Sequence, residues 1–512
     1  HFFDELINVI IMLIQFFRTE KNYFCRQDQS NQMKKNTIFR FLFFLISLSL
    51  FAQKPQKLTS NQIYEKLQKL NFLGTALYIA AHPDDENTRL IAYLANKVKA
   101  RTGYLSLTRG DGGQNLIGPE IRELLGVIRT QELLAARRVD GGEQLFSRAN
   151  DFGYSKHPDE TLEIWDKQAV LGDVVWAIRT FKPDVIINRF DHRTPGTTHG
   201  HHTASAMLSV EAFDLAIDKT KFTDQLKYTS VWQPKRLFQN TSSWFYSDKS
   251  KFKAAAKDFT KFDIGVYYPL KGLSNNELAS MASSQHLCQG FGRLTTRGEQ
   301  TEYAELLKGA PLKDKTDIFS GINTTWNRIA NGGEIGDILY EVENNFDFIN
   351  PSKHLPQLME AYLLIQKLED DHWRVIKEKQ IKIIIEACLG LYLEVSAVSS
   401  SGTPNSKAEV NFEVLNRSNV PIILTSITST LDKKIIYKGF DLEKNKKLNF
   451  KEQILLNTNI FSDPYWLKKE SSLGMYKVDN QELIGKPQTP RVVKVDFNLV
   501  VNYLPITISK NV

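Results

Sequence analysis

The sequence predicts an α/β fold built on a parallel sheet, followed by a helical segment and a C-terminal antiparallel β-sandwich. Up to about residue 310, short apolar runs alternate with helix-like stretches, which is the pattern of strands joined by crossover helices. Residues 311–390 have a mostly helical pattern. After about Tyr392, alternating polar and apolar residues between Asn, Ser, Gly and Lys turns indicate short antiparallel strands.

The 512 residues are enough for several domains. We expect an upstream extension and a signal peptide in residues 1–52, and the α/β domain in 53–310. We expect a helical connecting region in 311–390 and the β-sandwich in 391–512. The chain ends on an apparent strand, so a truncated sandwich is the alternative to a complete one.

The segment Met33–Ala52 has the pattern of a secretory signal peptide. Two lysines follow the methionine, an apolar stretch covers residues 41–51, and Ala52 is a small residue at the expected cleavage site. The apolar stretch is shorter than the ~20 residues of a membrane span. We therefore expect translation to start at Met33 and a secreted or periplasmic protein with no stable membrane span after signal removal. An N-terminal anchor helix is the alternative.

The charge and the cysteine content argue against nucleic-acid binding and against cysteine-based sites. The formal net charge of +7 is spread along the chain without a basic block, so nucleic-acid binding is not expected. Cys25 lies in the segment expected to be removed, and Cys288 and Cys388 are far apart with no C-x-x-C motif. A disulfide framework or cysteine metal site is not indicated, and a single Cys288–Cys388 bridge stays open for an exported protein.

The elements of the α/β domain follow from hydrophobic periodicity and turn residues. The first strand is expected at 77–81 and the second at 102–108, and the second ends in the glycine-rich loop 109–115. Helices are expected at 87–98, from about Pro119 to Arg138, at 166–181 and at 203–217, and further strands at 144–146 and 184–190. In the C-terminal part, we expect a helix at 355–368 and strands at 409–414, 422–427, 434–437 and 491–502.

A histidine and two adjacent carboxylates follow the first predicted strand. His82, Asp84 and Asp85 stand in the string Ala-His-Pro-Asp-Asp-Glu. Imidazole and carboxylate together suit zinc or a similar divalent ion. Two neighbouring carboxylates allow one to bind the metal while the other takes a proton from the metal's water. The alternative is a polar helix N-cap, where aspartate is favoured.

A histidine cluster, His199-Gly200-His201-His202, follows the predicted strand 184–190. By itself it is equally typical of a solvated loop. Because both clusters follow a strand and precede a helix, both are expected at the carboxyl edge of the sheet, where open α/β folds bind ligands. Two histidines and one carboxylate leave an open position for water, as a hydrolytic metal site requires.

The Ala81–Glu86 string together with the later H-x-x-H motif resembles the PIG-L/LmbE family of metal-dependent N-deacetylases, over roughly residues 74–310. The resemblance implies a Rossmann-like domain that removes the acetyl group from an N-acetylglucosamine-type sugar or glycoconjugate. It implies Zn²⁺ as cofactor, with Fe²⁺ or another divalent metal as alternatives.

The resemblance also assigns roles to residues. It implies His82, Asp85 and His202 as metal ligands, Asp84 as general base, and a protonated His199 that stabilises the tetrahedral intermediate. Many family members have an aspartate where this chain has His201, which makes His201 a rival third ligand, although the spacing favours His202.

Three further residues are candidates for the site. The resemblance implies that Asp151, in the loop 148–153, binds a substrate hydroxyl, and a turn-forming aspartate is the alternative. Arg109 in the glycine-rich loop suits binding of a hydroxyl or an anionic group, and a surface arginine is its alternative. His286 either lines the pocket or, more simply, ends a helix before glycine.

We therefore predict a zinc-dependent N-deacetylase, a hydrolase of linear amide bonds, whose partner is an N-acetylated sugar or glycoconjugate. An exported carbohydrate-binding protein with a vestigial metal site is the alternative from another class. A nucleotide-binding protein is disfavoured because no G-x-G-x-x-G follows the first strand.

Overall fold

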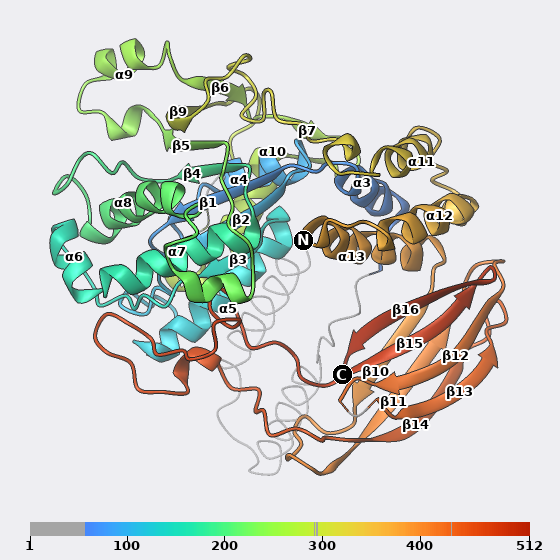
Figure 1. Ribbon diagram of the computed structural model, residues 1–512. Helices are drawn as coiled ribbons and strands as arrows, with labels where there is room; N and C mark the ends of the chain where they lie inside the picture. Colours follow the sequence, from blue (N-terminus) through green and yellow to red (C-terminus); the bar gives the residue numbers. More distant parts are fainter. Residues whose placement is uncertain (1–56, 291, 293–294, 432) are drawn as a thin grey trace, which may run out of the picture. The chain divides into compact units, whose positions relative to one another are not determined.

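The computed structural model describes residues 57–290, 292, 295–431 and 433–512 (Figure 1). The predicted upstream extension, the signal peptide and Cys25 lie outside the described residues. In the part of the chain that is described, no helix combines the length and the apolar character needed to cross a membrane.

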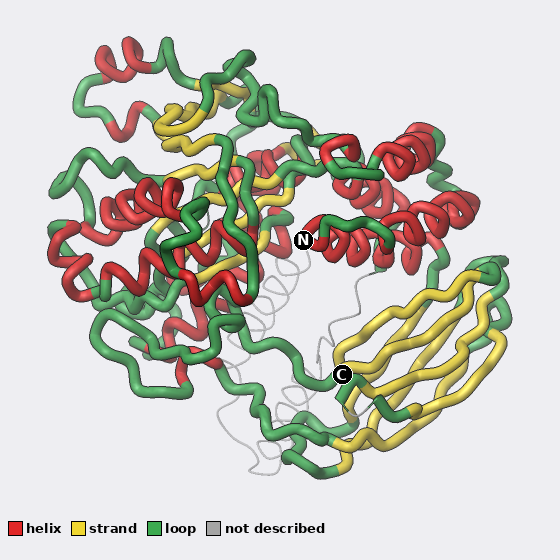
Figure 2. Tube along the Cα trace, in the orientation of Figure 1, coloured by secondary structure: helices red, strands yellow, loops and turns green. Residues whose placement is uncertain are grey.

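A seven-stranded sheet forms the centre of the first part of the chain, with strand order β3-β2-β1-β4-β5-β9-β6 (Figures 1 and 2). The first five strands in this order are parallel, and β9 runs antiparallel to both β5 and β6. The predicted parallel sheet is thus confirmed for five strands, within a mixed sheet. The strands are β1 Thr75–Ala80, β2 Arg101–Ser106, β3 Glu143–Phe146, β4 Val185–Asn188, β5 Arg236–Thr241, β6 Thr260–Asp263 and β9 Thr301–Gly309.

Helices cover both faces of this sheet. On β1, Leu77 and Ile79 join one core with α7 (Lys167–Phe181) and α8 (Gly200–Leu215). Tyr78 and Ala80 join the other core, with α4 (Thr88–Asn96) and α5 (Glu123–Asp140). Because side chains alternate between the two faces of a strand, β1 is buried along its whole length. The elements here are α4 Thr88–Asn96, α5 Glu123–Asp140, α6 Pro158–Ile164, α7 Lys167–Phe181, α8 Gly200–Leu215, α9 Lys249–Ala255, the short strands β7 Tyr267–Tyr268 and β8 Leu273–Ser274, and α10 Asn275–Ser283.

The helical region shares one hydrophobic core with the C-terminal strands. Helix α3, Ser60–Leu70, which we expected in the α/β domain, contributes Ile63, Leu67 and Leu70 to that core and packs against α13. The domain boundaries therefore stay predictions. The remaining helices are α11 Gly333–Asn344, α12 Leu355–Gln366 and α13 Asp371–Cys388, and both Cys288 and Cys388 are free, buried thiols, so the bridge left open above is not formed.

The C-terminal strands form two antiparallel sheets, of three and four strands, which confirms the predicted sandwich. Alternate residues such as Val410, Phe412 and Phe497 point into the shared core. One sheet has β10 Tyr392–Ala397, β11 Lys407–Leu415 and β14 Leu448–Leu455, and the other has β13 Ile435–Asp441, β12 Ile422–Ser429, β15 Lys494–Val501 and β16 Leu504–Asn511.

Residues 462–488, which we call the strap, connect β14 to β15 outside both sheets. The strap runs beside α5 and β3, where Figure 1 shows it as an orange-red coil. The backbone of Tyr476 donates to the carbonyl of Arg148 at 2.8 Å, and the backbone of Asn150 donates to the carbonyl of Gly474 at 2.9 Å. A segment more than 300 residues later in the chain therefore holds the loop 148–153 in place, and no sequence pattern predicts this contact.

Candidate metal centre

The two predicted clusters meet where the strand order of the sheet reverses. Strand β1 pairs with β2 on one side and with β4 on the other, all in parallel. In such folds the loops after the two central strands diverge and leave a crevice at the carboxyl edge. His82 follows β1, and His199 lies between β4 and α8, so the topology brings both clusters to this crevice.

The backbone after β1 is held by side chains of its own motif. The amide of His82 donates to Asp85 Oδ2 at 2.7 Å. Asp84 has a φ of 105°, a region that residues other than glycine rarely adopt. Its amide donates to Glu86 Oε2 at 2.9 Å, so Glu86 fixes the strained turn that presents the Asp84 carboxylate.

The second cluster starts a helix rather than a loop. His199 is the N-cap of α8, and its Nδ1 accepts the amide of His201 at 3.1 Å. Helix α8 therefore begins at Gly200, earlier than the predicted 203, and carries both following histidines in its first turn. A Cβ on Gly200 would lie within 2.6 Å of three neighbouring oxygen atoms, so only glycine fits at this position.

Two sets of side chains are close enough to share a metal ion. The donor atoms of His82, Asp85 and His202 lie within 4.8 Å of one another, and so do those of His82, His199 and His201. Both candidates for the third ligand, His201 and His202, therefore lie close enough to His82 to share a metal ion with it.

His202 is oriented toward Asp85. Its Nδ1 lies 2.9 Å from Thr198 Oγ1, its ring stacks on Phe190 at 3.8 Å between centroids, and its Nε2 lies 3.3 Å from Asp85 Oδ1. Metal-binding histidines are commonly fixed in this way, through a hydrogen bond at the nitrogen that does not bind the metal. His202 is thus pre-oriented to offer Nε2.

His201 lies deeper in the protein. It is fully buried, its ring packs against Phe152 and Trp165, and its Nδ1 lies 2.9 Å from His82 Nε2. Asp151 Oδ1 lies 3.8 Å from the same Nδ1. The predicted substrate-binding Asp151 is therefore beside the histidine cluster, but whether it binds a hydroxyl stays a prediction.

Their surroundings shift the pKa values of the two adjacent aspartates, Asp84 and Asp85, in opposite directions. Burial and the negative charge of Asp85 raise the pKa of Asp84 to about 7. Burial alone would also raise the pKa of Asp85, but the neighbouring His202 and His82 together hold it well below its ordinary value. Asp85 is thus a permanent carboxylate, whereas Asp84 exchanges a proton near neutral pH.

The surroundings of His199 favour its neutral form. Burial, reinforced by His82 and His202, lowers the pKa of His199 to about 4. Its Nδ1 accepts a backbone amide, so the proton of the neutral ring is on Nε2. In this arrangement the neutral His199 ring offers Nε2–H as a hydrogen-bond donor, and the expected protonated His199 stays a prediction.

The family model PIG-L, GlcNAc-PI de-N-acetylase, matches residues 77–213, which include both clusters. The predicted resemblance is confirmed for residues 77–213, which we call the PIG-L-matching segment. Among curated proteins, no match was found.

Solved structures give weaker similarities. An N,N′-diacetylchitobiose deacetylase from Pyrococcus horikoshii is 14% identical, covering 51% of this chain and 82% of its own, with a TM-score of 0.30. A 4-carboxy-2-hydroxymuconate hydratase from Pseudomonas putida is 14% identical, covering 47% and 99%, with a TM-score of 0.31. A conserved protein from Thermus thermophilus is 21% identical, covering 41% and 80%, with a TM-score of 0.28. Scores this low carry no argument about the function of this chain.

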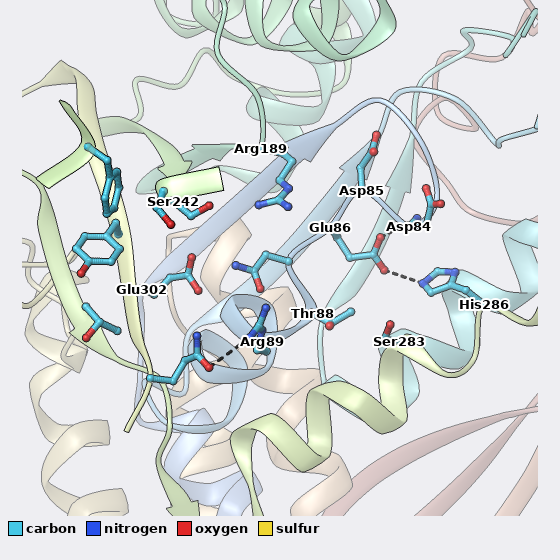
Figure 3. A pocket seen from close by; sticks show the side chains of 16 residues that line it. Asp84, Asp85, Glu86, Thr88, Arg89, Arg189, Ser242, Ser283, His286 and Glu302 are labelled. Carbon is cyan, nitrogen blue, oxygen red and sulfur yellow. Dashed lines mark hydrogen bonds and ion pairs between the residues drawn. The ribbon is translucent and has the colours of Figure 1, made fainter. Parts of the chain in front are cut away.

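A buried charge network joins the PIG-L-matching segment to His286, which lies outside it. Glu86 Oε1 accepts from His286 Nε2 at 2.9 Å and from Arg137 at 3.1 Å, and Arg137 also pairs with Asp140 at 2.6 Å. Figure 3 shows His286 reaching Glu86 beside Asp84. His286 thus lines the pocket, the first of our two interpretations. The partnership of Glu86 with a residue 200 positions later has no local sequence signal.

A polar cavity of about 390 Å³ opens beside the two aspartates (Figure 3). Arginines, carboxylates and hydroxyl groups dominate its walls. Such a lining suits a hydroxyl-rich ligand that both donates and accepts hydrogen bonds. The residues around it include Asp84, Asp85, Glu86, Arg89, Arg189, Ser242, Ser283, His286, Glu302 and Tyr303.

Arg109 does not lie at this site, which corrects its prediction as a substrate-binding residue. It is only 1% exposed and donates to the carbonyl oxygens of Lys486 and Pro487 in the strap, at 3.2 and 3.0 Å. Its guanidinium lies between the rings of Trp466 and Phe146, 3.4 and 4.2 Å from their centroids. Arg109 is also not the surface arginine that we gave as the alternative, because the strap covers it.

Replacing Arg109 with alanine is expected to loosen the strap. The change removes the ring contacts and leaves strap carbonyls without their donor, so we expect the free energy of unfolding to fall by about 3 kcal/mol. Urea unfolding followed by circular dichroism measures this. Arg138→Ala, at an exposed position of α5, is the matched control. Equal stability of both variants would contradict a role of Arg109 in holding the strap.

Proposed function

We propose that this protein is a metal-dependent N-deacetylase that hydrolyses the acetamide of an N-acetylglucosamine-type sugar or glycoconjugate. One observation carries the proposal. The donor atoms of His82, Asp85 and His202 converge beside the Asp84 carboxylate at the edge of a polar cavity. The match of residues 77–213 to the PIG-L family supports the same chemistry.

Two imidazoles and one carboxylate are a donor set that fits zinc, with ferrous iron as an alternative. We favour His202 over His201 as the third ligand. His202 is partly exposed and points its Nε2 to Asp85, whereas His201 is fully buried, and a hydrolytic site needs a position open to water. When bound, zinc supplies a Lewis acid that polarises the carbonyl and acidifies water.

The side chains of the protein then move the protons. Asp84 accepts a proton from the attacking water as the water oxygen bonds to the acetamide carbon. The Nε2–H of His199 donates to the oxygen that becomes negative. The carbon–nitrogen bond breaks, and the proton held by Asp84 passes to the leaving nitrogen. The hydroxyl left on the acyl carbon gives up its proton as well, so the products are acetate and the protonated amino sugar, and both hydrogens of water are accounted for.

A screen of N-acetylated compounds tests the proposal. Zinc-loaded full-length protein is incubated with N-acetylglucosamine, N,N′-diacetylchitobiose, GlcNAc-phosphatidylinositol and, as a non-sugar control, N-acetyl-lysine. We expect acetate from at least one sugar and none from N-acetyl-lysine. Binding of a sugar without acetate release would instead favour the carbohydrate-binding alternative. Secretion or periplasmic location remains part of the proposal, and fractionation of the producing cell tests it.

We expect Glu86→Gln to lower turnover about tenfold or more by releasing the strained turn at Asp84, because a misplaced base loses most of its contribution. The measurement is a double-mutant cycle with Asp84→Asn, together with metal content. If Glu86 acts only through Asp84, Glu86→Gln has no further effect on turnover in the Asp84→Asn background. Additive losses in the cycle would show that Glu86 acts elsewhere.

A further inference from the structure

A second cavity, of about 440 Å³, lies where α5, the strap and the loops of the sandwich meet. Its walls come from α5, the strap, the loop between β10 and β11, the segment after β14 and the segment that leads into β15. In the described part of the chain, it shares no lining residue with the polar cavity beside Asp84 and Asp85. A ligand in this second cavity is therefore not the acetamide under attack.

The polar part of the walls is almost uncharged. Among the described residues that line the cavity, only Arg491 has a charged side chain. Hydroxyl and amide groups come from the exposed side chains of Gln131, Ser400, Ser462 and Gln488. Such groups both donate and accept hydrogen bonds, so the lining suits a neutral ligand that is rich in hydroxyl groups.

Trp466 of the strap adds a buried hydrogen-bond donor to this wall. The residue is only 3% exposed, and the guanidinium of Arg109 lies 3.4 Å from its ring centroid. Its Nε1 is buried without a hydrogen-bond partner in the described part of the chain. A buried N–H of this kind is costly unless a ligand or an ordered water accepts from it. The wall is therefore complete only with an acceptor, such as a hydroxyl oxygen.

Large apolar side chains line the same cavity. Ile460 and Phe461, which follow β14, are 56% and 61% exposed. Exposed apolar side chains next to hydroxyl and amide groups suit a sugar ring, which has apolar C–H faces and an edge of hydroxyl groups. The lining therefore matches both surfaces of a sugar.

The backbone around the cavity does not favour a peptide. The amide of Asn405 donates to the carbonyl of Leu456, and the amide of Leu456 donates to the carbonyl of Ser406, both at 2.8 Å. The amide of Val512 donates to the carbonyl of Val493 at 3.1 Å. An extended peptide that adds to a sheet needs unpaired backbone groups, and these are already paired with one another. Recognition in this cavity therefore depends on side chains, as it does for a sugar.

We propose that this cavity is a non-catalytic binding site for a neutral glycan chain. The Nε1–H of Trp466 and the amide of Gln488 hydrogen-bond the hydroxyls of the chain, and Phe461 packs against a sugar ring. Apart from α5, the walls lie outside the PIG-L-matching segment. The site thus holds the protein on a glycan independently of the compound on which the metal centre acts.

The test is isothermal titration of the full-length protein with neutral tetrasaccharides of glucose, mannose, xylose and N-acetylglucosamine. The last of these is titrated in the Asp84→Asn background, so that it is not hydrolysed. The variant is Phe461→Ala/Gln488→Ala, which changes two exposed side chains of the cavity. Tyr503→Ala is the matched control, because this aromatic side chain is 88% exposed and does not line the cavity. We expect wild type and control to bind at least one tetrasaccharide, and the double variant to bind it about tenfold more weakly.

Equal binding by the double variant and the wild type would overturn the inference, and so would an equal loss in the control or a lack of binding to all four glycans. A neutral proline-rich decapeptide is titrated in parallel. If the wild type binds this peptide and the double variant does not, the cavity is a peptide site and the glycan assignment is wrong. None of these results depends on acetate release, so failure of the proposed function leaves the test intact.

Discussion

Asp84→Asn is expected to reduce acetate release by about 10²–10⁴-fold while leaving the bound metal in place, because asparagine cannot accept the proton of water. The change keeps the size of the side chain, and asparagine tolerates positive φ better than most residues, so the turn with its φ of 105° is retained. Turnover and metal content of the purified variant are measured together.

Asp258→Asn is the control for this substitution, since the Asp258 side chain is 90% exposed. Full activity of Asp84→Asn would mean that another group accepts the proton. Loss of both activity and metal would mean instead that Asp84 is a ligand, and the roles given to the two aspartates would then be wrong.

His202→Ala is expected to abolish metal binding and, with it, activity. Removing one of three protein ligands leaves only His82 and Asp85, too few to hold zinc against dialysis. Metal content is measured by mass spectrometry after dialysis, and circular dichroism checks that the fold is kept. His201→Gln serves as the comparison, because it removes the rival ligand.

If His201→Gln loses the metal and His202→Ala keeps it, the site is the alternative set of His82, His199 and His201. If only His202→Ala loses it, the set with Asp85 is supported. The two outcomes separate the ligand sets without any activity measurement.

The two clusters could be predicted from local sequence patterns, namely strands that end in histidine and carboxylate residues. A strand that stops at His82, and a strand followed by His199-Gly200-His201-His202, both reappear at the carboxyl edge of β1 and β4. Parallel topology makes this meeting follow from local sequence, since strands that alternate with helices place their carboxyl ends on one edge. The candidate metal ligands could therefore be predicted from the sequence alone.

What escaped prediction depends on contacts between distant parts of the chain. In the sequence, Arg109 has only the pattern of a loop residue, whereas in the structure the strap covers it. The strap itself is an irregular segment whose sequence has no periodicity. In the sequence, Glu86 is only the last residue of the Ala81–Glu86 motif. In the structure, His286 and Arg137 hold its carboxylate, which accepts the amide of Asp84 and so stabilises the turn. Neither partnership leaves a pattern in a single sequence.

In our proposal, this protein hydrolyses an acetamide with a metal held at His82, Asp85 and His202. The most direct test strips the metal with a chelator, adds back increasing zinc, and measures bound zinc and acetate release from N-acetylated sugar in the same samples. We expect acetate release to be absent from stripped protein and to rise in proportion to bound zinc. Undiminished release from stripped protein, or none from fully loaded protein with any of the sugars, would contradict it.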